Sequence, residues 1–425
     1  MFPKKYLSLV FCFAISLALV LAVTTVTVFE RSIGIDFYQY WVVPKILKEY
    51  PNKHIYNLEE RQQLANIYYE DFNNKQSSLQ LALASYYRRD DLRLSSTPFL
   101  YAVMSLFSGV DYDFDLRFCR FVSGLLAVVA ILILGYFARF SLLLSSLIAF
   151  LYLFFFAPYR SDLYVGNINQ LQLFLLVLLL AALKGKQSLS WFFGGLVAAG
   201  ICFLKPNLVL ILPMLSIFWF FQRCFRKLLM FIFGVCFGSA IYFVIGNNFI
   251  GADSAWFEWL QIAERLHQSK GYSLLDGNFS LRALSRLVWP SVNSVIISLT
   301  VLGLSLLVVL RTSIILKSQQ FIEDTIEWHL ILLSLLTTFL ASELVWLHYY
   351  TVLLPFLILN LRRARTRGHF LISDYLSLIG FFLLGVNYWW FAENVSALLA
   401  AQLAVFGVVL FYLATCINLT RSELS

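Results

Sequence analysis

The chain has 425 residues, of which 60% are hydrophobic and only 13% charged, and its mean hydropathy is +0.77. Soluble proteins average roughly 25% charged residues, so this composition excludes a soluble globular protein and an intrinsically disordered one. The net charge of +8 does not indicate nucleic acid as a partner, because the basic residues cluster in short loops between apolar segments. We predict an all-α, multi-pass membrane protein that forms a single domain over residues 1–425.

Apolar segments close to the length needed to cross a bilayer recur along the whole chain. The first follows MFPKKY and is longer than the apolar core of a signal peptide, so we interpret it as an uncleaved span. Twelve spans are predicted, at residues 7–28, 121–138, 141–157, 164–183, 189–204, 207–222, 228–246, 292–310, 329–343, 345–361, 371–391 and 395–417.

The basic residues predict the orientation of these spans. With the amino terminus inside, every short basic loop falls in the cytoplasm, as the positive-inside rule requires. These residues are Lys4, Lys5, Arg139, Lys184, Lys186, Arg223, Arg226, Lys227, Arg311, Lys317, Arg362, Arg363, Arg365 and Arg367. The orientation leaves two long loops outside, 29–120 and 247–291. As the location we predict a plasma membrane of bacterial type.

Two shorter helices are expected within the first outer loop. Residues 58–69 are amphipathic, with Tyr and Leu spaced for one helical face. Residues 97–110 are apolar, but counting them as a span would place all the later basic loops outside. We therefore predict a helix that dips into the outer face of the membrane or lies on it.

No motif for a cofactor or a metal stands out. The chain has no Walker motif, no G-x-G-x-x-G and no HExxH, and its six cysteines lack C-x-x-C spacing. The sequence Asp111-Tyr112-Asp113 is formally D-x-D, but we give it little weight as a metal site. We predict no cofactor and no metal.

Polar residues gather instead at the outer ends of the apolar segments. Asp36 follows the first span among aromatic residues that include Tyr40. A partly desolvated carboxylate can act as a general base. The alternative is a helix-capping aspartate beside an interfacial aromatic belt.

The next two clusters open and separate predicted spans. Asn167, Asn169 and Gln170 begin a span, where free N–H groups and the helix dipole favour an anion such as phosphate, although ordinary capping is the alternative. Lys205 falls on the outer face, against the positive-inside trend. It either has a partner in a site or extends to the interface by snorkelling.

The last two clusters lie in the second outer loop and between two late spans. Asn278, Arg282 and Arg286 occur together, and the two arginines share a helical face. Glu343 and His348 are separated by four residues, and a histidine there can orient or neutralise a phosphate. Solvated loop charges and a packing histidine are the alternatives.

The order of these motifs resembles glycosyltransferase family 87, the polyprenol-phosphate-mannose-dependent mannosyltransferases of the membrane-embedded type C fold. The resemblance runs from Asp36 to about Pro355. Its elements are Asp36–Trp41, Ser96–Phe99, Gly166–Asn169, Lys205-Pro206, Asn278–Leu281 with Arg286, and Ser342–Tyr349. Asn167 stands where the family has glutamine and Glu343 where it has proline, which leaves mannose itself open.

The resemblance implies inverting transfer of a sugar, with mannose as the family's sugar, on the non-cytoplasmic face. The donor would be a polyprenyl-phosphate sugar, the acceptor a glycolipid or glycan, and membrane lipids the surroundings. It implies Asp36 and His348 as catalytic residues, Lys205, Arg282 and Arg286 on the donor phosphate, and sugar or acceptor contacts by Tyr40, Asn167, Asn169, Gln170, Asn278 and Glu343. A flippase or transporter of polyprenyl-linked sugars, or a lipid-linked glycan ligase or polymerase, is the alternative.

Overall fold

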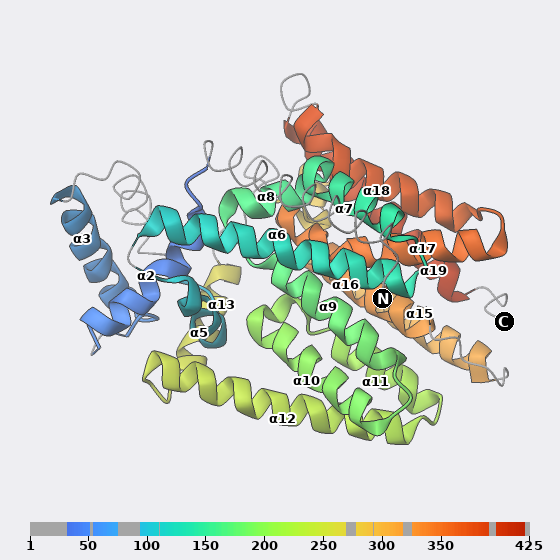
Figure 1. Ribbon diagram of the computed structural model, residues 1–425, viewed down its shortest axis with the longest axis horizontal. Helices are drawn as coiled ribbons and strands as arrows, with labels where there is room; N and C mark the ends of the chain where they lie inside the picture. The colour runs from blue at the N-terminus through green and yellow to red at the C-terminus, as the bar shows by residue number, and fades with distance from the viewer. Residues whose placement is uncertain are drawn as a thin grey trace, which may run out of the picture.

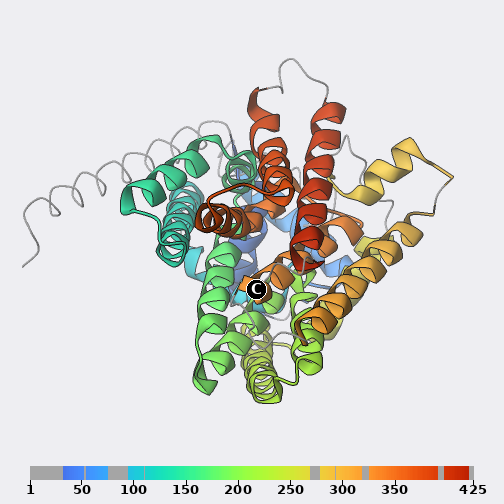
Figure 2. The same ribbon diagram turned by 90° about the vertical axis from the view of Figure 1, so that its right-hand side faces the viewer.

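The computed structural model describes residues 32–51, 54–74, 94–109, 111–268, 278–291, 293–317, 325–390 and 397–420. These residues form helices and connecting turns without any strand, which confirms the all-α prediction (Figures 1 and 2). The first predicted span, 7–28, lies outside the described residues. So does the middle of the first predicted outer loop.

The α-helices of the described residues cover most of the predicted apolar segments and several segments of the predicted outer loops. They are α2 (Ile35–Glu49), α3 (Leu58–Asn74), α5 (Pro98–Met104), α6 (Tyr112–Phe137), α7 (Leu142–Phe155), α8 (Ala157–Val165), α9 (Asn169–Lys184), α10 (Ser188–Leu204), α11 (Ile211–Phe221), α12 (Phe225–Ile250), α13 (Ala255–Gln268), α14 (Leu281–Val288), α15 (Ser294–Lys317), α16 (Thr325–Ala341), α17 (Leu354–Arg367), α18 (Ile372–Trp390) and α19 (Ala397–Thr420). Three 3₁₀ turns join them: η2 (Ser105–Phe107), η3 (Pro206–Leu208) and η5 (Leu347–Leu353).

Several of these helices are long and apolar enough to cross a membrane, so the chain has the character of a multi-pass membrane protein. Four qualify within the described residues: α6, α12, most of α15 and most of α19. A fifth results if α7 and α8, which meet at a bend of 58°, count as one broken span. The structure therefore does not reproduce the predicted count of twelve spans.

Helix length explains the difference. A helix rises about 1.5 Å per residue and the hydrocarbon core is about 30 Å thick. Helix α9 has 16 residues, so it extends only about 24 Å. The predicted span 345–361 is interrupted, because η5 occupies its first half and α17 then runs into four arginines.

Elements from the two predicted outer loops lie together at one end of the molecule. Figure 1 shows α2, α3, α5 and α13 grouped there. Helix α3 confirms the helix predicted at 58–69 and buries one face, through Arg61, Leu64 and Ala65. Helix α5 with η2 confirms a short apolar helix at 97–110. It packs against α12, where the rings of Phe99 and Tyr242 lie 4.6 Å apart.

Helices α10 and α12 cross at the distance of backbone contact. A Cβ atom on Gly195 would lie 2.0 Å from the carbonyl oxygen of Phe231, and one on Gly234 would lie 2.0 Å from that of Phe192. Gly234 and Gly238 form a G-x-x-x-G pattern on α12, which is the pattern that lets helix backbones approach within a membrane. This crossing brings the carboxyl end of α10, and hence Lys205, into the bundle.

We predict that Gly234→Leu destabilises the protein by about 1–3 kcal/mol, because a side chain there must push two helix backbones apart. Thermal unfolding in detergent, followed by circular dichroism, measures this. Gly303→Leu is the matched control, since a Cβ atom at Gly303 would meet nothing within 4 Å. Equal unfolding midpoints for the two variants would contradict the close crossing.

Candidate functional site

Two glycines in left-handed backbone conformation bring α2 to the junction of α8 and α9. Gly34, with φ of 67°, precedes α2, and Gly166, with φ of 69°, ends α8. A Cβ atom on Gly166 would lie 2.6 Å from the Cβ of Phe37. Only glycine fits both the conformation and the contact. The first turn of α2, which carries Asp36, therefore lies against the turn that carries Asn167.

The α8–α9 junction is held by a buried carboxylate. The carboxylate of Asp162 accepts hydrogen bonds from Asn169 Nδ2 at 2.6 Å and Gln170 Nε2 at 2.9 Å. Its backbone carbonyl accepts from the N–H groups of Gly166 and Asn167. Gln170 accepts in turn from the Tyr152 hydroxyl at 3.0 Å. These bonds fix which way the polar side chains at the start of α9 face.

Four of the predicted site residues meet around the amide of Asn167. Its Nδ2 donates to Asp36 Oδ2 at 2.6 Å and lies 3.4 Å from Nε2 of His348. Its Oδ1 accepts from the Lys205 ammonium at 2.7 Å. The four side chains come from α2, the α8–α9 turn, the link after α10 and η5. Separate clusters in the sequence thus form one hydrogen-bonded network.

Lys205 is the cation of this network. Its Nζ donates to Asn169 Oδ1 at 2.9 Å as well as to Asn167, and it lies 4.7 Å from the centre of the Tyr349 ring. The lysine therefore has partners within the candidate site, which was one of the two interpretations of this residue from the sequence. The capping alternative for Asp36 is not observed, because α2 has no side-chain cap and the carboxylate bonds to Asn167 instead.

Burial shifts the pKa of each ionisable group in this network, and none of them belongs to the helices that qualify as spans. Burial raises the pKa of Asp36, while the Asn167 hydrogen bond and the Lys205 charge oppose the rise. Burial lowers the pKa of Lys205 to about 8, opposed by Asp162 and Asp36. Burial and the Lys205 charge lower the pKa of His348 well below its usual range, so the imidazole is neutral at pH 7.

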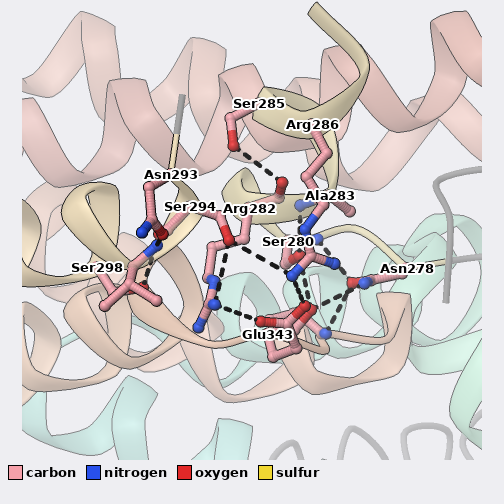
Figure 3. A network of polar contacts seen from close by, with 12 residues as sticks. Asn278, Ser280, Arg282, Ala283, Ser285, Arg286, Asn293, Ser294, Ser298 and Glu343 are labelled. Atoms are coloured by element: carbon pink, nitrogen blue, oxygen red, sulfur yellow. Dashed lines mark hydrogen bonds and ion pairs between the residues drawn. The ribbon is translucent and has the colours of Figure 1, made fainter. Parts of the chain in front are cut away.

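A second cluster forms around Glu343 (Figure 3). Its carboxylate pairs with both arginines of α14, one oxygen at 2.6 Å from Arg282 Nη2 and the other with Arg286. Asn278 donates to the backbone carbonyl of Glu343 at 2.9 Å and accepts from the N–H of Val345 at 3.0 Å. The amide of Asn278 thereby binds the 343–345 backbone, which leads directly into η5.

The remaining predicted site residues are buried near these clusters. Tyr40 lies one turn after Asp36 on α2, is 2% exposed, and packs against Tyr101 with ring centres 6.4 Å apart. Asn169 and Gln170 are 1% and 0% exposed and bond to Asp162. Asp111 of the D-x-D sequence caps α6 through the N–H of Phe114.

Sequence reasoning missed Asp162 and Tyr349. Local spacing offered no reason to include Asp162, because its amide partners lie seven and eight residues away, beyond one helical turn. The reversal at Gly166 makes those contacts possible. An acidic residue within an apolar stretch, just before a polar break, was the available signal.

Comparison of the chain with protein-family models, with curated proteins and with solved structures finds no match to any of them. The family resemblance therefore stays a prediction.

We predict that Asn167 and Lys205 are energetically coupled. Asn167→Leu and Lys205→Met should each cost about 1–3 kcal/mol, because each leaves a buried partner without its hydrogen bond. The double variant should cost clearly less than the sum. The measurement is the free energy of unfolding in detergent. Lys205→Met combined with Asn360→Leu is the control pair, since Asn360 bonds to His329 in a separate network. Additivity in the Asn167–Lys205 cycle would contradict the network.

Proposed function

We propose that the protein is a membrane glycosyltransferase that moves a sugar from a polyprenyl-phosphate donor to a lipid or glycan acceptor on the non-cytoplasmic face. Mannose is the sugar that the family resemblance suggests. The observation that carries the proposal is the contact network of Asp36, Asn167, Lys205 and His348. It holds one carboxylate and one ammonium, linked by a single amide, among buried aromatic side chains.

Asp36 and Lys205 match the two reacting groups that need help, the acceptor hydroxyl and the leaving phosphate. Asp36 takes the proton of the acceptor hydroxyl as that oxygen attacks the sugar carbon. The bond between this carbon and the phosphate oxygen breaks, and its electron pair leaves with polyprenyl phosphate. Lys205 stabilises the negative charge that grows on the phosphate. A single displacement inverts the configuration at the sugar carbon. It needs no second acid, because phosphate leaves without a proton.

In the proposed reaction His348 contributes a hydrogen bond but no positive charge. A neutral imidazole beside Asn167 and the Lys205 ammonium orients the phosphate by a hydrogen bond and adds no charge. The positive charge of the proposed phosphate site comes from Lys205 and the α14 arginines. Arg282 and Arg286 share one carboxylate, so the pair retains a net positive charge, and the Arg282 Nε–H is buried without an acceptor among the described residues.

The proposed orientation retains the positive-inside argument, which places the link after α10 on the outer face. Of the twelve predicted spans, the proposal retains the four or five that the structure supports.

We predict that Asp36→Ala lowers the rate of sugar transfer by about 10²–10⁴-fold, the usual contribution of a general base, while donor binding is retained. The assay uses the purified protein in nanodiscs, polyprenyl-phosphate-mannose labelled in the sugar, and a panel of glycolipid acceptors. Asp374→Asn is the control, because Asp374 is a buried carboxylate paired with Arg367 elsewhere. Full activity in Asp36→Ala would refute the base assignment. Label that crosses the bilayer of proteoliposomes without reaching an acceptor would favour the flippase.

We predict a bell-shaped dependence of kcat/KM on pH. Asp36 acts when ionised, so the rate falls as the pH drops through its raised pKa. Lys205 acts when protonated, so the rate falls as the pH rises through about 8. In Lys205→Arg the alkaline limb near this value should disappear, because a guanidinium stays charged. An alkaline limb that is unchanged in Lys205→Arg would assign it to another group.

A further inference from the structure

Asp162 is a buried carboxylate that the proposed reaction does not use. It is 0% exposed, and each of its oxygens accepts one side-chain amide, from Asn169 and from Gln170. A carboxylate in such a place is costly unless it is paired. Asp162 lies on the last turn of α8, and a single amide, that of Asn169, links it to Lys205. This link indicates that Asp162 acts on the lysine.

Asp162 acts on Lys205 by fixing the orientation of the Asn169 amide. A carboxylate only accepts hydrogen bonds and an ammonium only donates them, whereas an amide has one end of each kind. With its Nδ2 held by Asp162 at 2.6 Å, Asn169 must direct its oxygen to Lys205 Nζ, which lies at 2.9 Å. A reversed amide would bring two donors together.

The same arrangement occurs on the other side of the lysine. Asp36 holds Nδ2 of Asn167 at 2.6 Å, and the oxygen of Asn167 accepts from Lys205 at 2.7 Å. The complete order is carboxylate, amide, ammonium, amide, carboxylate. One end, Asp36, carries the proposed base, and the other end, Asp162, lies out of contact with solvent.

We propose that Asp162 is a positioning residue that acts through Asn169. It holds the Lys205 ammonium in place and keeps it protonated. The role of that ammonium toward a leaving phosphate rests on the proposed function, whereas the coupling of Asp162 to Lys205 does not. With Asp36 engaged in proton transfer, Asp162 is the anion that stays with the lysine throughout.

The charges around Lys205 fix the sign of the expected effect. Asp36 faces it from α2, Asp162 from α8, and His348 and Tyr349 from η5. Burial lowers the pKa of Lys205 to about 8, and the charge of Asp162 opposes burial more than that of Asp36 does. Loss of the Asp162 charge must therefore lower the pKa of Lys205 further, so that the lysine loses its proton closer to neutral pH.

Asp162→Asn removes this charge with little change in shape. The new amide can keep the bond from Asn169 if Gln170 turns its own amide around. That turn is tolerated because the partner of Gln170 is the Tyr152 hydroxyl, which can accept as well as donate. The variant therefore separates the charge of Asp162 from the packing of the site.

The test is competitive labelling of lysines with acetic anhydride across the neutral and alkaline range, read by mass spectrometry on the full-length protein in nanodiscs. In Asp162→Asn the labelling midpoint of the partly exposed Lys205 should move down by about one pH unit. Lys227 is the internal control, because its partner is Glu327 at 2.6 Å. Asp374→Asn is the matched control variant and should leave Lys205 unchanged.

A folded Asp162→Asn protein with an unshifted Lys205 midpoint would overturn the inference. If Asp162→Asn does not fold, Asn169→Leu replaces it: it removes the amide through which Asp162 acts, so the midpoint should move down, and no movement would overturn the inference equally. The labelling needs no turnover. A shifted midpoint in a protein that transfers no sugar therefore supports the role of Asp162 while refuting the proposed function.

Discussion

The candidate site depends on one constraint, which is that a half-buried ammonium surrounded by buried amides must find acceptors. Lys205 lies between α10 and η3, and burial makes its charge costly. The oxygens of Asn167 and Asn169 satisfy two of its donors, and a carboxylate orients each of these amides. Moving any member would leave a buried donor or acceptor unpaired, so the lysine fixes the relative positions of α2, α8, α9 and η5.

The fold meets this constraint with close backbone approaches. Gly166 lets the α8–α9 turn touch α2, while Gly195 and Gly234 let α10 touch α12. Both contacts shorten the distance that the side chains of Asp36 and Lys205 must span to reach Asn167. Helix α9 begins at the site with Asn169, and helix α10 ends there just before Lys205.

Sequence reasoning singled out several residues that the structure brings together, because these residues break strong apolar patterns. Asp36, Lys205 and His348 each lie at the edge of a long hydrophobic segment, and the charge of Lys205 opposed the orientation rule. Asp162 was missed because its contacts depend on a chain reversal that no local periodicity indicates. The count of twelve spans was not reproduced, since hydropathy shows where helices occur but not whether each is long enough to cross. The pairing of Glu343 with both Arg282 and Arg286 could likewise be seen only in the structure, because the sequence does not show that α14 lies beside residue 343.

The most direct test of the central claim is an experimental structure of the protein in nanodiscs with polyprenyl phosphate bound. We expect a phosphate oxygen within hydrogen-bonding distance of Lys205 Nζ, with Asp36 on the side open to an acceptor. A phosphate bound elsewhere, with Lys205 still held by Asn167 and Asn169 alone, would contradict it.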